Sequence, residues 1–262
     1  MALSKRGAIF ATIITAFAAP GISQEAPLSA VATVGMVGDV VTHVGGECVD
    51  VAVMMGPGID PHLYQATARD VQNLNDADVI FYSGQGLEGQ LGEVLARFAE
   101  RIPTLAVTQT IASERLVETD DSYGVDPHLW MDAALWAEIV PPIAEQISAL
   151  RPDCAEAVSE RAANYVEALH ALDSWAKETI ATIPEAQRVL VTAHDAFEYF
   201  SRAYGIEVEA IQGISTQSEA GIADIRETAN LLVEKQIPAI FVETTINPRT
   251  VEAVIEAAAR QG

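Results

Sequence analysis

The feature that most constrains the fold of this chain is a long segment without helix-breaking residues. Between Pro152 and Ile183 there is no glycine and no second proline, and alanine and glutamate are the commonest residues. Proline suits the first turn of a helix, and Pro184 marks its end. A helix over these 32 residues would be roughly 48 Å long. We interpret it as a rigid connector between two lobes, with a long surface helix on one domain as the alternative.

The segments before this helix alternate between expected strands and expected helices. Thr67 and Asp70 resemble a capping box, and Gly45-Gly46 follows a helix where a left-handed cap is needed. Pro141-Pro142 should kink or interrupt the last helix of the series. Strands are predicted at 28–34, 49–54, 78–82 and 104–107, and helices at 36–44, from Thr67, at 88–99 and from about residue 132.

A second series of the same kind follows the long helix. Strands are predicted at 188–192, 207–211 and 239–242, and helices at 196–204, 219–235 and 248–260. Such alternation is typical of parallel sheets covered by helices. We therefore predict an α/β protein of two lobes, each a parallel sheet covered by helices, joined by one long helix.

The predicted boundaries divide the chain into a signal peptide and three parts. The N-terminal lobe covers 24–150, the connecting helix 151–184 and the C-terminal lobe 185–262. The first lobe has four predicted strands, but the second has three and ends in a helix. We expect the second lobe to be truncated, with a C-terminal strand and helix missing.

The N-terminus indicates export. Lys5 and Arg6 form a short basic region, Gly7 to Phe17 is apolar, and Ala16-Phe17-Ala18 offers small residues for cleavage. We interpret residues 1–23 as a cleaved signal peptide, with a membrane anchor as the alternative. Because no cysteine closely follows the apolar stretch, we expect a periplasmic protein without the lipid attachment of a lipoprotein.

Composition restricts the partners. Half of the 262 residues are hydrophobic, which is enough for a sizeable core, and the net charge is −22. Removal of Lys5 and Arg6 with the signal peptide would lower that charge to −24. A chain this acidic is repelled by phosphate, so we expect no nucleic-acid partner. The acidity is compatible with a cationic cargo but is weak evidence for one.

The chain has two cysteines, Cys48 and Cys154, in separate segments. They lack the CxxC spacing of a zinc or redox motif. An oxidising compartment permits a disulfide between them, but sequence alone leaves the pairing open.

A repeated pentapeptide carries the strongest functional signal. Asp60-Pro61-His62-Leu63-Tyr64 returns as Asp126-Pro127-His128-Leu129-Trp130, and a third histidine, His194, follows the first strand of the second lobe. All three histidines come after predicted strands, where parallel sheets form ligand sites. Imidazole suits zinc and other divalent first-row metals, and each proline restricts the backbone before its histidine. We therefore predict that His62, His128 and His194 surround one metal ion.

The same histidines also have an ordinary interpretation. A single histidine in a loop is more often a surface residue, and Asp-Pro is a common turn starter. The near-identity of the two strings is what favours ligands. We leave out His43, near a helix C-terminus, and His170, which we expect to face solvent from the long helix.

Together these motifs resemble the TroA-like family of periplasmic metal-binding proteins, the zinc and manganese solute-binding proteins of ABC importers. The resemblance covers nearly all of the mature chain. Its segments are 56–64, 126–132, 191–200, 213–220 and 240–243, which read GPGIDPHLY, DPHLWMD, VTAHDAFEYF, GISTQSEA and IFVE.

The resemblance implies a function and a ligand set. It implies capture of Zn²⁺ or Mn²⁺, with Fe²⁺ as a further candidate, between two lobes joined by a long helix. Delivery would go to a membrane permease with its cytoplasmic ATPase. Matching the motifs assigns the ligand role to His62, His128 and His194, and we expect a monomer.

This sequence departs from the family pattern in two ways. The family's fourth ligand, a carboxylate on a later strand, would lie beyond Gly262. Thr108 to Asp126 lacks the histidine-rich stretch of many zinc-specific members, which removes one argument for zinc. Glu243 ends a strand and is a possible substitute, although we expect it to pair with Arg249 or a helix end.

The competing function is a secreted zinc-dependent hydrolase, because three histidines with an open position also describe a catalytic zinc site. Such an enzyme needs a general base, and Asp195 or Glu243 would have to provide it. No HExxH or comparable motif is present. We therefore expect a binding protein and not an enzyme.

Overall fold

A computed structural model describes residues 26–119 and 124–261 of the chain. The predicted signal peptide lies outside the described residues. The elements follow one another in this order: β1 (Leu28–Val34), α1 (Gly35–Gly45), β2 (Val49–Met55), α2 (Ala68–Asp76), β3 (Val79–Tyr82), α3 (Leu91–Phe98), β4 (Thr104–Ala106), α4 (Ala133–Trp136), α5 (Val140–Leu150), α6 (Ala155–Ala181), β5 (Val189–His194), α7 (Glu198–Tyr204), β6 (Glu207–Gln212), α8 (Ile222–Glu234) and α9 (Pro248–Ala259).

Four parallel strands form the sheet of the first lobe, in the order β2-β1-β3-β4. Residues 30–34 of the central strand β1 are all buried, as a strand covered on both faces requires. The four predicted strands are confirmed. Because the strands are parallel, their carboxyl ends lie along one edge, and the loops after β1 and β2 leave from that edge.

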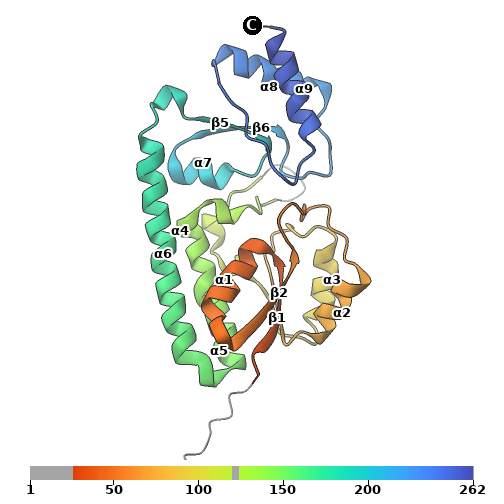
Figure 1. Cartoon of the computed structure of the whole chain (residues 1–262), viewed down its shortest axis with the longest axis vertical. Coiled ribbons are helices and arrows are strands. Elements are labelled where there is room, and N and C mark those ends of the chain that lie inside the picture. Colours follow the sequence, from red (N-terminus) through yellow and green to blue (C-terminus); the bar gives the residue numbers. More distant parts are fainter. Residues whose placement is uncertain (1–25, 120–123, 262) are drawn as a thin grey trace, which may run out of the picture.

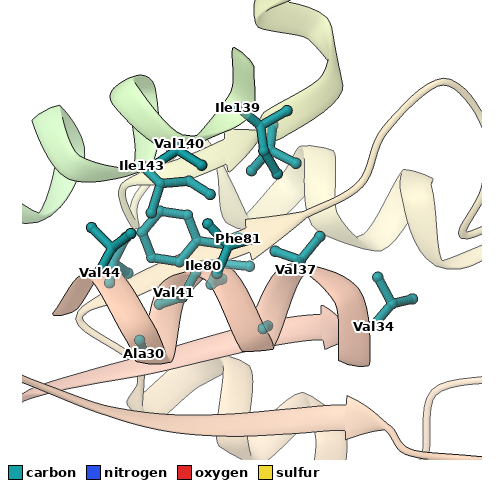
Figure 2. Close-up of a cluster of buried hydrophobic side chains, with 14 of the residues drawn as sticks. Ala30, Val34, Val37, Val41, Val44, Ile80, Phe81, Ile139, Val140 and Ile143 are labelled. Carbon is teal, nitrogen blue, oxygen red and sulfur yellow. The ribbon is translucent and has the colours of Figure 1, made fainter. Parts of the chain in front are cut away.

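Helix α1 shows how the sequence builds this lobe. Val37, Val40, Val41 and Val44 repeat at helical spacing and are fully buried. Figure 2 shows the side chains of α1 meeting Phe81 of β3 on one side of the sheet. Each fully buried valine contributes about 1.5–3 kcal/mol of hydrophobic free energy.

The residues at the ends of α1 and α2 are those that the sequence predicts to cap helices. Thr67 and Asp70 form the predicted capping box of α2, and Gly46 follows α1 with a φ of 53°. The interruption predicted at Pro141-Pro142 is confirmed: the helical segment that starts at Ala133 breaks at a 3₁₀ turn over Ala137–Ile139. The two prolines then occupy the first turn of α5, where a missing N–H costs nothing.

The long helix α6 runs along one side of the molecule, from the end of α5 to the start of β5 (Figure 1). It packs against α1, α4 and α5 of the first lobe and against α7 of the second. The helix has 27 residues instead of the predicted 32, because residues 152–154 form a separate 3₁₀ turn and the helix ends at Ala181, two residues early. The prediction that one helix connects the lobes is confirmed in its essentials. The domain boundaries at residues 150, 151, 184 and 185 stay predictions.

The second lobe has a smaller sheet than predicted. Parallel strands β5 and β6 pair along their length, and α8 and α9 pack against each other beside them. The predicted strand at 239–242 is wrong. Pro238 has no N–H to donate, and the segment bonds to β5 through one backbone hydrogen bond, from Phe241 to Val191.

A disulfide joins Cys48 to Cys154 across 106 residues of sequence. Cys48 directly precedes β2 and Cys154 directly precedes α6, so the bond links two parts of the first lobe's frame. It lies at the amino end of β2, away from the edge where the strands end. The pairing that sequence left open is therefore resolved.

Within the described ranges, the structure contains no helix that combines the length and apolar character of a membrane span.

Candidate metal centre

The three predicted ligands converge although 66 residues separate each from the next. One nitrogen of each imidazole lies within 4.8 Å of the other two. Nε2 of His62 is 3.2 Å from Nε2 of His128, and the ring of His194 lies 5.3 Å from that of His128. All three side chains are buried. His43 and His170 are exposed and do not belong to the cluster.

His62 sits in the loop after β2, and its backbone is fixed from two sides. Its N–H donates to Oδ1 of Asp60 at 2.9 Å. Gly89 packs against its carbonyl group, because a Cβ at Gly89 would come within 2.6 Å of the His62 oxygen. The φ of Gly89 is +47°, which also favours glycine. The position of this imidazole therefore depends on a loop 27 residues downstream.

The loop that carries Gly89 is organised by Glu88, whose role the sequence analysis missed. Its buried carboxylate accepts hydrogen bonds from Oγ1 of Thr33 at 2.8 Å and from the backbone N–H of Ser83 at 2.6 Å. A third bond comes from the N–H of Gly84. Burial raises the pKa of Glu88, which these three bonds partly counter. The glycine-rich stretch directly after β3 was the available sequence signal.

His128 directly precedes a 3₁₀ turn at Leu129–Met131 and is held by Asp126. Oδ1 of Asp126 accepts the backbone N–H of His128 at 2.9 Å and lies 2.7 Å from its Nδ1. The carboxylate fixes the ring so that Nε2 faces the other two histidines. Burial lowers the pKa of His128 more than Asp126 raises it, so the neutral imidazole is favoured.

His194 is the last residue of β5, paired with Gln212 of β6. It therefore lies within the strand that we expected to end two residues earlier. Oε1 of Glu243 accepts the N–H groups of His194 and Ala193, and Oε2 lies 2.5 Å from Nδ1 of His194. Burial raises the pKa of Glu243, but its contacts with His194 outweigh this effect and leave the pKa lowered.

The role expected for Glu243 is therefore wrong. The carboxylate does not pair with Arg249 or a helix end but orients His194. The expectation failed because the partner lies 49 residues earlier, and no local spacing connects the two. The acidic residue that follows the apolar run Ile240-Phe241-Val242 was the available signal.

The cluster lines a cavity of about 310 Å³ between the lobes. Met36, Met55 and Trp130 contribute apolar walls, while Asp60 and Thr216 are among the polar residues. Burial and the neighbouring His128 lower the pKa of His62 to about 4. The lowered pKa values of His62 and His128 favour neutral imidazoles, which can accept a cation without first losing protons.

The fold and the site together define a class: a two-lobe α/β solute-binding protein with its ligand site between the lobes. The chain also matches a family model described as zinc-uptake complex component A, periplasmic, over residues 30–262. It belongs to that family. This membership confirms the resemblance drawn from the Asp-Pro-His motifs.

The curated relatives carry manganese and zinc names. The chain is 40% identical to the manganese-binding lipoprotein MntA of Bacillus subtilis over 265 residues, which cover 98% of this chain and 87% of MntA. It is also 40% identical to the zinc-binding protein TroA of Treponema pallidum, over 94% of this chain and 80% of TroA.

Solved structures agree with the fold. The periplasmic zinc-binding protein TroA from Treponema pallidum matches with a TM-score of 0.87 at 39% identity, over 90% of this chain and 85% of that one. Fe(III)-bound YtgA from Chlamydia trachomatis matches with a TM-score of 0.80 at 25% identity, over 88% and 85%.

Proposed function

We propose that this protein captures a divalent metal ion outside the cytoplasm and delivers it to an ABC importer. His62, His128 and His194 bind the ion, and the cavity between the lobes shields it from water. The observation that carries the proposal is the convergence of three buried imidazole nitrogens within 4.8 Å of one another. Within this group, the 3.2 Å between Nε2 of His62 and Nε2 of His128 suits two metal–nitrogen bonds of about 2.0–2.1 Å to one ion.

A second observation supports a cation at this place. Asp126 is fully buried, and its Oδ2 has no hydrogen-bond partner among the described residues. A buried carboxylate is costly unless positive charge compensates it. A metal ion on Nε2 of His128 makes that imidazole a stronger donor to Asp126, and so supplies the missing compensation.

Zn²⁺ and Mn²⁺ are the candidate cargoes, with Fe²⁺ as a further one. Relatives are named for manganese and zinc, and a similar structure is of an Fe(III)-bound protein. Nitrogen donors bind Zn²⁺ more tightly than Mn²⁺ in the general order of affinities. An additional oxygen ligand would moderate that preference.

We propose a carrier and not a hydrolase, because the carboxylates beside the cluster already have other roles. Glu243 is committed to His194, and Asp126 to His128. A zinc hydrolase needs a carboxylate or imidazole that can take a proton from bound water. These two side chains orient ligands instead.

The partners follow from the family. Relatives are named as substrate-binding lipoproteins of ABC transporters, so the receiving partner is a permease with its ATPase. We propose that the chain is exported by a cleaved signal peptide at 1–23, stays in the periplasm without a lipid anchor and acts as a monomer. Intact mass and N-terminal sequence of the protein from its native compartment test the cleavage and the absence of lipid.

Calorimetric titration with Zn²⁺ and with Mn²⁺ tests the ligand assignment. We expect one ion per chain, and His62→Ala, His128→Ala and His194→Ala should each weaken binding by more than about 100-fold, beyond the range typical of outer-shell changes. His43→Ala and His170→Ala are matched controls that should bind as the unchanged chain does. Unchanged affinity in the three ligand variants would refute the proposal.

A further inference from the structure

The second lobe is tied to the first most firmly on the side that carries His128. The fully buried Tyr199 of α7 donates to the carbonyl oxygen of Asp126 and accepts the N–H of Val117, both at 3.0 Å. Tyr204, also on α7, accepts the N–H of Ala133. Helix α7 therefore belongs by sequence to the second lobe but holds the chain segment on which His128 is mounted.

The side that carries His62 is joined to the second lobe in a different way. Oγ1 of Thr216, in the loop between β6 and α8, donates to Oδ2 of Asp60 at 2.6 Å. The other oxygen of that carboxylate accepts the N–H of His62. Both Thr216 and Asp60 are half-buried and line the cavity. One carboxylate thus connects a second-lobe hydroxyl to the backbone of a proposed ligand.

We infer that Thr216 is a positioning residue that holds the His62 loop against the second lobe and slows release of the bound ion. This inference rests on the proposed function. The ion would connect His62 of the first lobe to His194 of the second, and the bond from Thr216 to Asp60 connects the same two lobes at the cavity wall. The two connections act in parallel. The loop after β2 can therefore move His62 away from the ion only after the hydrogen bond from Thr216 to Asp60 has broken.

The size of the effect follows from the charge of the acceptor. A hydrogen bond from a hydroxyl to a half-buried carboxylate is stronger than one between neutral groups. Its loss should speed dissociation about tenfold. The buried contacts of α7 are untouched by a change at Thr216, so the lobes should stay assembled.

The test compares metal release from three variants of the full chain. Thr216→Val removes the hydroxyl but keeps the branched shape, Thr216→Ser restores a hydroxyl, and Thr245→Val alters another threonine of the same cavity. The hydroxyl of Thr245 makes no hydrogen bond within residues 26–119 and 124–261. Release of Zn²⁺ is followed by stopped flow into excess chelator, and near-UV circular dichroism checks the fold; Thr216→Ala replaces the valine variant if that one does not fold.

We expect release about tenfold faster in Thr216→Val, with Thr216→Ser within about twofold of the unchanged chain and Thr245→Val unaltered. Release from Thr216→Val at the unchanged rate, or failure of serine to restore slow release, would overturn the inference and leave the proposed function intact. Absence of metal binding in the unchanged chain would instead refute the proposed function itself.

Discussion

The two lobes hold their histidines by the same chemistry but over different distances in the sequence. In the first lobe, Asp60 and Asp126 each accept the backbone N–H of the histidine two residues later. In the second lobe, Glu243 accepts the N–H of His194 from 49 residues away. Asp126 and Glu243 also lie against Nδ1 of their imidazoles, which orients the rings and strengthens them as ligands. The contacts of Asp60 and Asp126 form within a short segment of chain. The contact of Glu243 forms only when the second lobe is assembled.

The hydrophobic cores of the two lobes differ as well. The first lobe has a large continuous core and the disulfide, while the core of the second contains Val191, Ala193, Ile211, Ala229, Leu232, Val251 and Val254. More buried apolar surface gives more hydrophobic free energy and a stiffer support. We therefore expect the frame of the first lobe to be a fixed platform, relative to which the second lobe and the His62 loop move.

The largest expected effect concerns the platform. Replacing Cys48 and Cys154 by serine removes a crosslink that closes a loop of 106 residues, and should lower the free energy of unfolding by about 4 kcal/mol. Urea unfolding measures this loss. The disulfide lies at the amino ends of β2 and α6, so metal affinity at the opposite edge should change by less than about threefold. A parallel loss of affinity would show that the platform and the site are coupled.

The next effect concerns acid. The pKa of His62 is about 4, compared with an ordinary value of 6.5, so the unfolded state binds more protons than the folded state between these values. Stability should therefore decrease as pH falls from about 6.5 to about 4, by about 3 kcal/mol from this residue. His128, whose pKa is also lowered, should add to the loss.

Urea unfolding of the metal-free chain at pH 7 and pH 4 checks this prediction. His62→Gln cannot take up the proton and serves as the control, since both chains share the ordinary titration of their carboxylates. The unchanged chain should lose more stability than the variant over this range. Equal losses in the two chains would mean that His62 is not held in its neutral form.

The third effect concerns Glu243, the distant carboxylate that supports His194. Glu243→Ala removes the acceptor for the N–H groups at the end of β5 together with the partner of the His194 ring. We expect about 100-fold weaker metal binding, at the upper limit for residues behind a ligand. Calorimetric titration measures it, with Glu252→Ala, an exposed glutamate on α9, as the control. A change in metal affinity below about threefold would show that Glu243 does not support the site.

The smallest effect tests whether the local and distant supports are equivalent. Asp126→Asn and Glu243→Gln each keep an oxygen acceptor but remove the charge behind one imidazole. Both should weaken metal binding by about tenfold. If the two values differ by much more than threefold in the same titration, the supports are not equivalent and the lobes contribute unequally to affinity.

These residues also explain what could be predicted from sequence. The convergence of His62, His128 and His194 was predictable because each lies at or beyond the carboxyl end of a strand, and two of them share a five-residue string with its own supporting aspartate. Four strands of the first lobe and the helix between the lobes follow from apolar runs and from a segment free of glycine. Such signals are local in the sequence, and the structure contains the strands and the helix that they predict.

Contacts between distant segments were not predictable. Glu243 finds His194, Thr216 finds Asp60 and Glu88 arranges the loop behind His62 only after the sheets have formed. The predicted strand at 239–242 failed for a related reason: an apolar run shows that a segment can pair, but not whether a neighbouring strand pairs with it over its whole length.

The most direct test of the central claim is anomalous diffraction from crystals grown with Zn²⁺ or Mn²⁺. The account predicts one strong peak per chain, about 2.0–2.2 Å from a ring nitrogen of each of His62, His128 and His194. A peak bound elsewhere, or contacted by histidines of the first lobe alone, would contradict the claim that one ion is shared between the lobes.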